Sequence, residues 1–405
     1  MEKIKEREHD FVSKLRQDAT LQRLKDYIQW QRKCDVGDTD QDPPLFSPIS
    51  INLDLTTACN FSCPFCVDST LINTGKSLTL EEVQRTIDIL HAHGLLSVIL
   101  IGGGEPTLHP DIEKIIRYIK NKNLQVGIVT NGTRLERIET VVKSLKEKDW
   151  IRISVDAGEE ETFKQLHRPR TKVTLTQILE KAKRLKKKNP IVSLGYSFVI
   201  VWEGLEVNGR RLPANIHEIA KSVEMAKDFS FDYVSVKPCL IRMEESHRET
   251  LMKDVDRGRE KEIIDAIKSH LEEGRRVAGD AIKILESSNL KAMLHQEVDR
   301  IKRQPKRCHM QFFRTVVSPF GIFHCPAFRG VEEAKIGGPD GYFSEKKLRE
   351  SLQKMAQSIL TFDASEECKD VGCFYHHTNW WLEEFILSKE DLGEIERIEN
   401  DNFFL

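Results

Sequence analysis

The stretch that decides the fold is Ser50-Ile-Asn-Leu-Asp-Leu-Thr-Thr57, followed closely by Cys59-Asn-Phe-Ser-Cys63-Pro-Phe-Cys66. The first part is a short run rich in apolar and β-branched residues, which is typical of a strand. The second part places three cysteines within eight residues on the loop after that strand. In α/β folds, the carboxyl edge of a parallel sheet is where sites are built. The sequence therefore predicts a metal-binding loop at this edge.

A regular alternation of apolar runs and helical patterns continues from this point. The runs occupy 50–57, 95–101, 124–130, 150–155, 191–201 and 232–237, and the helical patterns occupy 79–93, 109–122, 134–148, 174–188 and 215–229. Thr79 with Glu82 three residues later is a capping-box signal for the first of these helices. Strands that alternate with helices predict βαβ units and a parallel sheet. Periodicity alone leaves a barrel and a doubly wound sheet both open.

The spacing of Cys59, Cys63 and Cys66 indicates which metal group to expect. A structural zinc ion usually takes four protein ligands. Three close cysteines instead suit a cubane [4Fe–4S] cluster with one iron left open. Two alternatives remain at this point: a zinc knuckle completed by a distant ligand, and a chance grouping.

The C-x3-C-x2-C loop resembles that of the radical S-adenosylmethionine (SAM) enzymes, and other segments agree in the expected order. Gly102-Gly-Gly-Glu-Pro106 is similar to their "GGEP" segment, Thr130-Asn-Gly132 to their "TNG", and Ser154-Val-Asp156 to their "S-x-D". The resemblance covers about residues 49–240. It implies an α/β fold, a partial (β/α)6 barrel with the cluster loop at its mouth.

The resemblance also implies a chemistry. The catalytic cysteines Cys59, Cys63 and Cys66 would hold a [4Fe–4S] cluster whose open iron is chelated by SAM. An electron from a donor such as flavodoxin or ferredoxin would cleave SAM to methionine and a 5'-deoxyadenosyl radical, which abstracts a hydrogen atom from substrate. The implied cofactor-binding residues are Phe65, Gly103, Gly104, Glu105, Asn131, Ser154 and Asp156. The alternatives are purely structural roles: tight turns for the glycines and Asn131, and a helix cap for Ser154 and Asp156.

Four further cysteines lie in the last hundred residues: Cys308, Cys325, Cys368 and Cys373. The first two bracket Ser318-Pro-Phe-Gly321, whose composition predicts a hairpin turn. Four thiols can close a zinc site or a fully ligated iron–sulfur cluster. The region resembles, more loosely, the short "twitch" version of the SPASM extension, which implies one auxiliary [4Fe–4S] cluster. The C-x4-C spacing of the last pair leaves the fourth ligand open, with His376 or His377 as substitutes.

The remaining chain divides by composition. We predict an N-terminal helical extension and linker over 1–48, the barrel over 49–240, a helical connector over 241–307, and an α+β auxiliary-cluster domain over 308–405. Within the connector, 258–273 and 279–303 are expected to be helices, and no clear strand is expected over 244–304. No repeat or low-complexity tract is present.

Several single residues carry weaker hypotheses. Arg152 precedes Ser154 by two, so both side chains are expected on one side of the strand. Lys237, at the end of the sixth strand, is either a substrate contact or a surface or salt-bridged lysine. Cys239, just past this strand, is either a hydrogen-atom donor or cluster ligand, or a small buried residue. His167 with Arg168 is read either as an anion-binding pair or as a surface pair at a helix end.

Composition excludes several classes. Lys and Arg number 62 against 64 Asp and Glu, which gives a formal net charge of −2 and makes nucleic acid an unlikely partner. No apolar run approaches the roughly 20 residues of a membrane span. The charged start MEKIKEREHDF does not read as a signal peptide, so we expect a cytoplasmic protein whose nine cysteines serve as ligands or core residues.

The expected substrate is a polar small molecule, such as a sugar, nucleoside or aminocyclitol, that is oxidised or rearranged. The first alternative is a maturase that modifies a ribosomally made peptide or protein. It is less favoured because residues 1–48 are too short for a leader-binding domain. The second alternative is a zinc-stabilised binding module without catalysis.

Overall fold

A computed structural model describes residues 10–35, 42–243, 249–252, 255, 257–398 and 400–405. Six parallel strands lie where the sequence predicts them: β1 (Ser50–Leu53), β2 (Ser97–Leu100), β3 (Gln125–Thr130), β4 (Trp150–Ser154), β5 (Ser193–Ile200) and β8 (Tyr233–Pro238). They are neighbours in this order within one ten-stranded sheet. The expected partial (β/α)6 barrel is confirmed.

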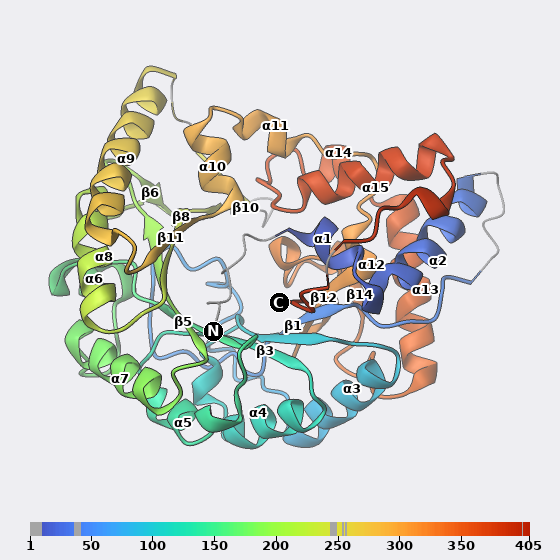
Figure 1. Cartoon of the computed structure of the whole chain (residues 1–405), viewed down its shortest axis with the longest axis horizontal. Helices are drawn as coiled ribbons and strands as arrows, with labels where there is room; N and C mark the ends of the chain where they lie inside the picture. The colour runs from blue at the N-terminus through green and yellow to red at the C-terminus, as the bar shows by residue number, and fades with distance from the viewer. Residues whose placement is uncertain (1–9, 36–41, 244–248, 253–254, 256, 399) are drawn as a thin grey trace.

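Helices cover one face of these strands and form the outer arc in Figure 1. They are α3 (Leu80–Ala92), α4 (Ile112–Asn121), α5 (Leu135–Glu139), α6 (Glu160–His167), α7 (Leu175–Lys188) and α8 (Ile219–Asp228). The capping box predicted for α3 is present, since Glu82 N donates to Thr79 Oγ1 at 3.2 Å and Thr79 N donates to Glu82 Oε2 at 2.7 Å. The pattern over 134–148 yields only the short α5 and a 3-10 turn (Val142–Ser144).

The connector differs from its expected all-helical form. Residues 279–303 contain strand β11 (Lys283–Glu286), followed by α10 (Ser288–Leu294) and α11 (Val298–Lys302). Strand β11 pairs in parallel with β8 and is reached through the long helix α9 (Arg257–Ala278). The expectation of no strand here was wrong, because a four-residue edge strand flanked by charged residues has too short an apolar run to stand out.

The predicted hairpin is confirmed and continues the barrel sheet. β12 (Arg314–Ser318) and β13 (Gly321–Phe323) pair antiparallel, and β14 (Lys335–Gly337) pairs with β13. β12 also pairs in parallel with β1, with Ser50 opposite Arg314. One sheet therefore joins the first cysteine loop to the region of the late cysteines.

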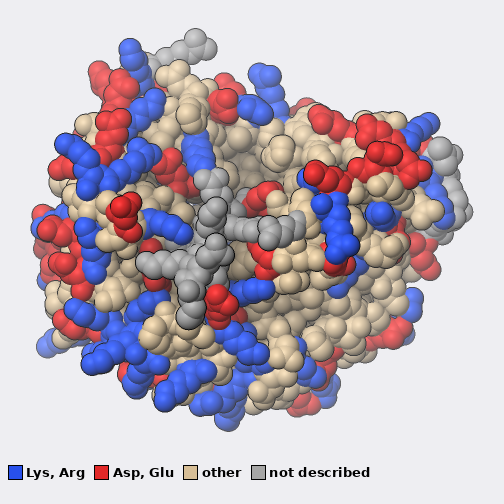
Figure 2. All heavy atoms as spheres, viewed as in Figure 1, with Lys and Arg blue, Asp and Glu red and all other residues tan. Residues whose placement is uncertain are grey.

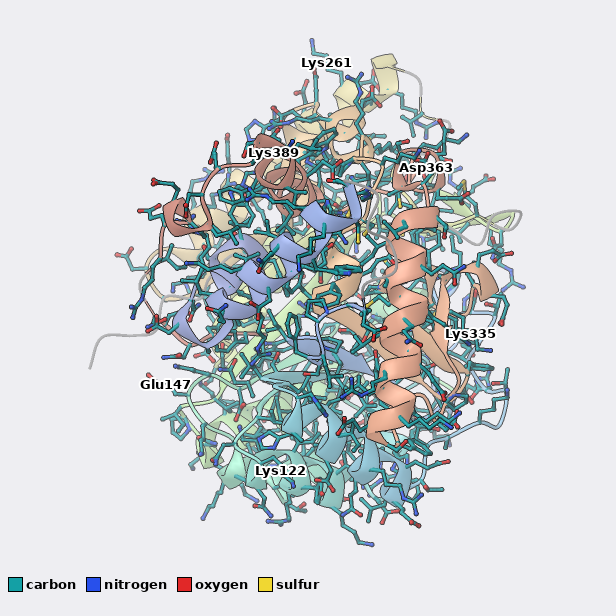
Figure 3. All side chains as sticks on the ribbon, turned by 90° about the vertical axis from the view of Figure 1, so that its right-hand side faces the viewer. Lys122, Glu147, Lys261, Lys335, Asp363 and Lys389 are labelled. Carbon is teal, nitrogen blue, oxygen red and sulfur yellow. The ribbon has the colours of Figure 1, made fainter. Side chains whose placement is uncertain are left out.

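The late region is completed by α12 (Met310–Phe313), α13 (Glu345–Thr361), α14 (Ala364–Glu367) and α15 (His376–Ser388). Figure 3 shows α13 along the outside of this region, between the labelled Lys335 and Asp363. The N-terminal helices α1 (Phe11–Leu15) and α2 (Asp18–Asp35) pack on α15 and bury Phe11, Leu15, Leu24 and Ile28. Residues 1–9 and 36–41 of the predicted extension and linker lie outside the described residues.

The face seen in Figure 2 shows acidic and basic side chains closely interspersed. Two short antiparallel pairs, β6 (Glu206–Val207) with β7 (Arg210–Arg211) and β9 (Ile241–Arg242) with β10 (Glu249–Thr250), complete the described strands. Among the described residues, no helix has both the length and the apolar character needed to cross a bilayer.

Candidate functional site

The loop that carries Cys59, Cys63 and Cys66 leaves the carboxyl end of β1, as predicted. All three side chains are half-buried. Cys66 N donates to Cys63 O at 3.2 Å, and Cys59 N donates to Asn73 Oδ1 at 2.9 Å. These bonds fold the loop back on itself, so the three cysteines lie on one stretch of ordered backbone.

Burial and mutual repulsion disfavour the ionised form of these thiols. Burial raises the pKa of Cys63 well above its usual range, and the neighbouring Cys66 and Cys59 raise it further. Burial, with help from the Asp68 carboxylate, raises the pKa of Cys66 to about 12. Three mutually repelling thiolates become stable only beside a positive centre, because metal binding replaces their protons. The donor set therefore fits a cationic iron–sulfur core.

The structure adds a residue that the sequence reading had assigned elsewhere. His167, at the end of α6, is 2% exposed, and its Nδ1 lies 3.2 Å from Cys63 Sγ. Its Nε2 lies 2.8 Å from Val155 O and 3.4 Å from Asp156 Oδ2. His167 is thus a buried neighbour of the cysteine loop, not a surface residue. No sequence signal could have shown this, because the contact joins residues 104 positions apart.

Gly103 and Gly104 pack directly against the cysteine loop. A Cβ on Gly104 would lie 2.4 Å from Ala58 O and 2.6 Å from the carbonyl carbon of Thr57. Gly103 has φ +65°, a conformation that favours glycine. The absence of a side chain at Gly104 therefore lets the loop before Cys59 close onto the end of β2.

We expect Gly104→Ala to lower the iron content by about four atoms per chain, because the added methyl group must displace the backbone that leads to Cys59. Iron analysis after anaerobic reconstitution measures the change. Gly274→Ala is the matched control, since the same methyl in α9 meets only the ends of side chains, those of Ile219 at 3.2 Å, Ile284 at 3.5 Å and Val223 at 3.6 Å, and no backbone. A Gly104→Ala protein with the iron content of the wild type would contradict this interpretation.

Glu105 and Asn131 bind the loops to one another. Glu105 Oε1 accepts from Thr107 N at 3.0 Å and from Thr130 Oγ1 at 2.6 Å, and its Oε2 accepts from Asn131 N at 2.7 Å. Asn131 Nδ2 donates to Asn60 Oδ1 at 2.7 Å, beside Cys59. These groups already hold the cysteine loop in place, so the SAM contacts expected for them stay predictions.

The other residues expected to bind the cofactor are Asp156, Ser154 and Phe65, and they differ in whether they already contact other parts of the fold. Asp156 Oδ1 accepts from Val199 N at 2.8 Å, and its backbone has φ +56°. Ser154 is half-buried at the end of β4. Phe65 lies edge-on to His167, with ring centroids 6.0 Å apart. Asp156 is thus engaged in the fold, while Ser154 and Phe65 stay candidates for cofactor contact.

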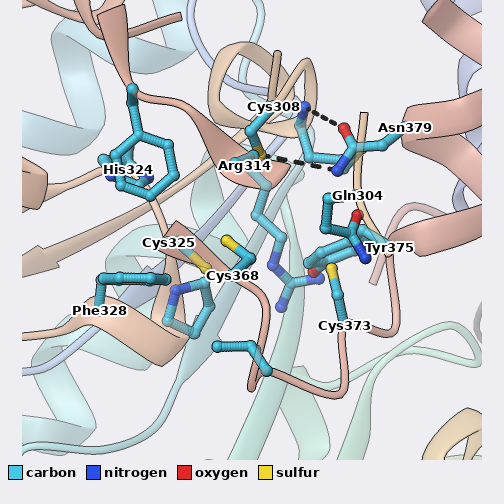
Figure 4. A pocket seen from close by; sticks show the side chains of 15 residues that line it. Gln304, Cys308, Arg314, His324, Cys325, Phe328, Cys368, Cys373, Tyr375 and Asn379 are labelled. Carbon is cyan, nitrogen blue, oxygen red and sulfur yellow. Dashed lines mark hydrogen bonds between the residues drawn. The ribbon is translucent and has the colours of Figure 1, made fainter. Parts of the chain in front are cut away.

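The four late cysteines come together in the structure. Cys308, Cys325, Cys368 and Cys373 line one pocket, although they span 66 positions of the sequence (Figure 4). His376 instead lines a separate surface pocket with Arg300 and Trp380, and His377 is exposed. The arrangement favours the four cysteines over the two histidines as ligands.

The environment of these thiols matches that of thiolate ligands. Burial raises the pKa of Cys325 to about 12, and Cys308 adds to the shift. Backbone N–H groups oppose it: those of Ala327 and Phe328 at Cys325, and those of Tyr375 and His376 at Cys373. Asn379 Nδ2 also points at Cys308 Sγ, 3.7 Å away. Such N–H contacts to sulfur are one of the ways in which proteins tune iron–sulfur clusters.

Two buried donors in the same pocket have unsatisfied nitrogens among the described residues. Arg314 Nη2 donates to Asn52 Oδ1 at 2.8 Å, but its Nε and Nη1 have no hydrogen-bond partner. His324 is 2% exposed, and neither ring nitrogen has a partner. In Figure 4 the Arg314 guanidinium points between Cys368 and Cys373. Among the described residues Arg314 forms no ion pair with a carboxylate, and an uncompensated buried charge is costly, so this pocket suits an anionic group such as an iron–sulfur cluster held by four thiolates.

Arg329 connects the two cysteine sites. It follows Cys325 by four residues, and its Nη1 donates to Asp68 Oδ1 at 2.9 Å. Its Nε lies 2.6 Å from Asp54 Oδ2 without a well-aimed N–H, which makes this contact an ion pair. Asp68 follows Cys66 by two residues, and Asp54 directly follows β1. One buried guanidinium therefore joins both loops. Within the described ranges, no group of three or more His, Cys, Asp or Glu side chains is arranged to hold a single metal ion.

Comparisons with known proteins agree with this architecture. The family model of the radical SAM superfamily matches residues 53–205. A probable GTP 3',8-cyclase from Pyrococcus abyssi is 27% identical over 197 residues, which are 47% of this chain and 63% of that protein. The antilisterial bacteriocin subtilosin biosynthesis protein AlbA of Bacillus subtilis is 28% identical over 193 residues, which are 46% of this chain and 40% of that protein.

Among solved structures, Streptococcus suis SuiB bound to precursor peptide SuiA has a TM-score of 0.54 at 15% identity. The alignment covers 84% of this chain and 79% of that chain, and the likeness is one of fold. The chain spans less than two thirds of the length of the curated relatives described above.

Proposed function

Residues 53–205 of this chain form a radical SAM domain, and on that premise we propose that the chain is a radical SAM enzyme that oxidises or rearranges a polar small molecule. The observation that carries the proposal is the loop of Cys59, Cys63 and Cys66, which closes against Gly104. When bound, a reduced [4Fe–4S] cluster with SAM supplies a 5'-deoxyadenosyl radical that abstracts a hydrogen atom from the substrate.

The residues of the chain have separate parts in this proposal. Cys59, Cys63 and Cys66 hold three irons, and the half-buried Ser154 is placed to contact SAM at the end of β4. Phe65 and His167 pack together beside Cys63 and limit the access of water. Glu105 keeps the ends of β2 and β3 together. A donor such as flavodoxin or ferredoxin supplies the electron.

For the late cysteines we propose an auxiliary [4Fe–4S] cluster, in a region similar to the twitch version of the SPASM extension. Support comes from the shared pocket and from the unsatisfied nitrogens of Arg314. Four cysteine ligands leave no open iron, which favours electron transfer over direct binding of the substrate. Zinc is the rival occupant, since zinc held by four thiolates is also anionic.

The substrate class has two candidates. A polar small molecule is favoured, and the similarity to a protein named for GTP cyclisation supports it. The second candidate is modification of a ribosomally made peptide, supported by the similarity to AlbA and by the fold shared with peptide-bound SuiB. A precursor peptide that copurifies with the chain would favour the second candidate.

The proposal is tested with anaerobically prepared wild-type chain. We expect about eight iron and about eight sulfide ions per chain, with little zinc. We also expect dithionite-reduced protein to release 5'-deoxyadenosine from SAM, measured by liquid chromatography with mass detection. Protein that holds zinc in both sites and releases no 5'-deoxyadenosine would instead be a zinc-stabilised binding module. If zinc replaces iron at the four late cysteines alone, the chain has a single cluster, and the proposed role of the late site in electron transfer is wrong.

A further inference from the structure

Arg152 and Lys237 share the face of the sheet that is turned away from the helices. On β4, Ile151 and Ile153 are buried in the hydrophobic core, and Ile153 lies beside Ile178 of α7. Arg152 therefore points to the opposite face, because side chains alternate along a strand. On β8, Val234 and Val236 are likewise buried in the core. Lys237 therefore shares the face of Arg152, which we call the lumen of the barrel.

Strand register places a row of hydroxyl groups between these two cations. Ser154 on β4 is opposite Ser197 on β5, and Ser197 is opposite Ser235 on β8. Arg152 precedes Ser154 by two residues and therefore lies nearer the amino ends of the strands. Lys237 follows Ser235 by two residues and lies nearer the carboxyl ends, where the cysteine loop begins. The two long cationic side chains thus lie on either side of this row, in which Ser197 is 1% exposed and its hydroxyl donates to Asp156 Oδ1 at 3.4 Å.

Aromatic rings lie next to Arg152, near the amino ends of the strands. The Trp150 ring fills the space over Gly127, where a Cβ would lie 2.5 Å from the indole, and Tyr233 fills the space over Gly195 in the same way, at 2.2 Å. The Arg152 guanidinium lies 5.3 Å from the Trp150 ring centre. This cation–π contact helps to hold the guanidinium in place.

Neither cation has its charge neutralised by a close carboxylate among the described residues. Arg152 Nε is buried and has no hydrogen-bond partner. Burial and, to a smaller extent, the nearby Arg152 charge lower the pKa of Lys237 to about 8, while Asp156 acts in the opposite sense. The Asp156 carboxylate is itself engaged with Val199 N and His167. Two cations that approach one another in a half-buried space are stabilised by an added anion.

We propose that Arg152 and Lys237 bind an anionic group of the substrate, a carboxylate or a phosphate, inside the barrel. This inference rests on the proposed function and narrows its substrate class to anionic small molecules. The half-buried Ser235 supplies a hydroxyl group for a further polar atom of the same ligand. An arginine is well suited to such a group, since its planar N–H groups match two oxygens of a carboxylate or phosphate.

The test measures protection of Lys237 from acetylation, which needs no turnover. Protein with its clusters is treated briefly with limiting acetic anhydride, and modification of each lysine is quantified by peptide mass spectrometry. Inorganic pyrophosphate and succinate serve as probes, with chloride at equal ionic strength as the blank. At about ten times the probe's dissociation constant, labelling of Lys237 is expected to slow about tenfold by mass action. Labelling of the exposed Lys221 should not change.

Two further arms identify the source of the anion. SAM alone carries a carboxylate, so a sample with SAM and no probe is included; full protection by SAM alone would overturn the assignment to the substrate. In Arg152→Gln, protection by pyrophosphate or succinate should be lost, whereas Arg134→Gln, an exposed control, should behave as the wild type. Lys237 of Arg152→Gln must still react more slowly than Lys221, which shows that the barrel is folded.

Absence of protection by either probe in the wild type would also overturn the inference. That result leaves the proposed function standing if the same protein still releases 5'-deoxyadenosine from SAM. Loss of iron and of SAM cleavage, with protection of Lys237 intact, would overturn the proposed function and leave the anion-binding site standing. The two failures are therefore distinguishable.

Discussion

Replacing Cys59, Cys63 and Cys66 together by alanine is expected to halve the iron content, from about eight to about four atoms per chain, and to abolish release of 5'-deoxyadenosine from SAM. The physical reason is that these are the thiols of the loop after β1, while the late cysteines line a separate pocket. Iron and sulfide analysis with anaerobic product assays measures both effects in one preparation.

Two controls make the result specific. Cys34→Ala removes a buried thiol in α2 and should keep the iron content and activity of the wild type. A variant with alanine at the four late cysteines should also lose about four irons, but from the other site. If the triple variant keeps all of its iron, or still releases 5'-deoxyadenosine, the assignment of the catalytic cluster is wrong.

The strands of the barrel could be predicted because their signal is local. Each of the six strands is a short apolar run between helical patterns, and the runs at 124–130 and 191–201 contain the observed β3 and β5. Strand β11 was missed because its four residues, Lys283–Glu286, carry a charge at each end. Its formation depends on pairing with β8, which no local pattern reveals.

The cysteines of both candidate sites could be predicted from the sequence, whereas the contacts that the surrounding residues make with them could not. Glu105 and Asn131 are expected to contact SAM, and the structure adds hydrogen bonds through which they hold the cysteine loop. The sequence leaves His167 either as half of an anion-binding pair or as a surface residue at a helix end, whereas in the structure it ends α6 as a buried residue against Cys63. These roles depend on contacts between residues far apart in the chain, so spacing alone does not show them.

The same limit applies to the link between the two cysteine sites. Arg329 lies in no recognisable motif, but it is fully buried between Asp54 and Asp68. Its backbone follows Cys325, and its guanidinium contacts the loop that carries Cys66. A rigid connection between the sites favours a fixed distance for electron transfer between the two proposed clusters.

We expect Arg329→Met to lower the free energy of unfolding by about 3–5 kcal/mol near neutral pH, because it leaves two buried carboxylates without their cation. Denaturant unfolding under anaerobic conditions measures the loss. Asp54→Asn in the Arg329→Met background should recover part of it, since one uncompensated charge is removed. Arg329→Lys, which keeps the charge but not the shape, should lose less than Arg329→Met.

The loss should depend on pH in a direction fixed by Asp54. Burial raises the pKa of Asp54 from 3.8 to about 7, although Arg329 lowers it. Between these values the folded chain binds a proton that the unfolded chain does not, so this group's contribution to stability falls as pH rises through the window. Without Arg329 the folded-state pKa rises further and the window extends upward. The destabilisation by Arg329→Met should therefore be larger at about pH 8 than at about pH 6. An equal loss at both pH values would show that Arg329 stabilises the protein through packing and not through the charge of Asp54.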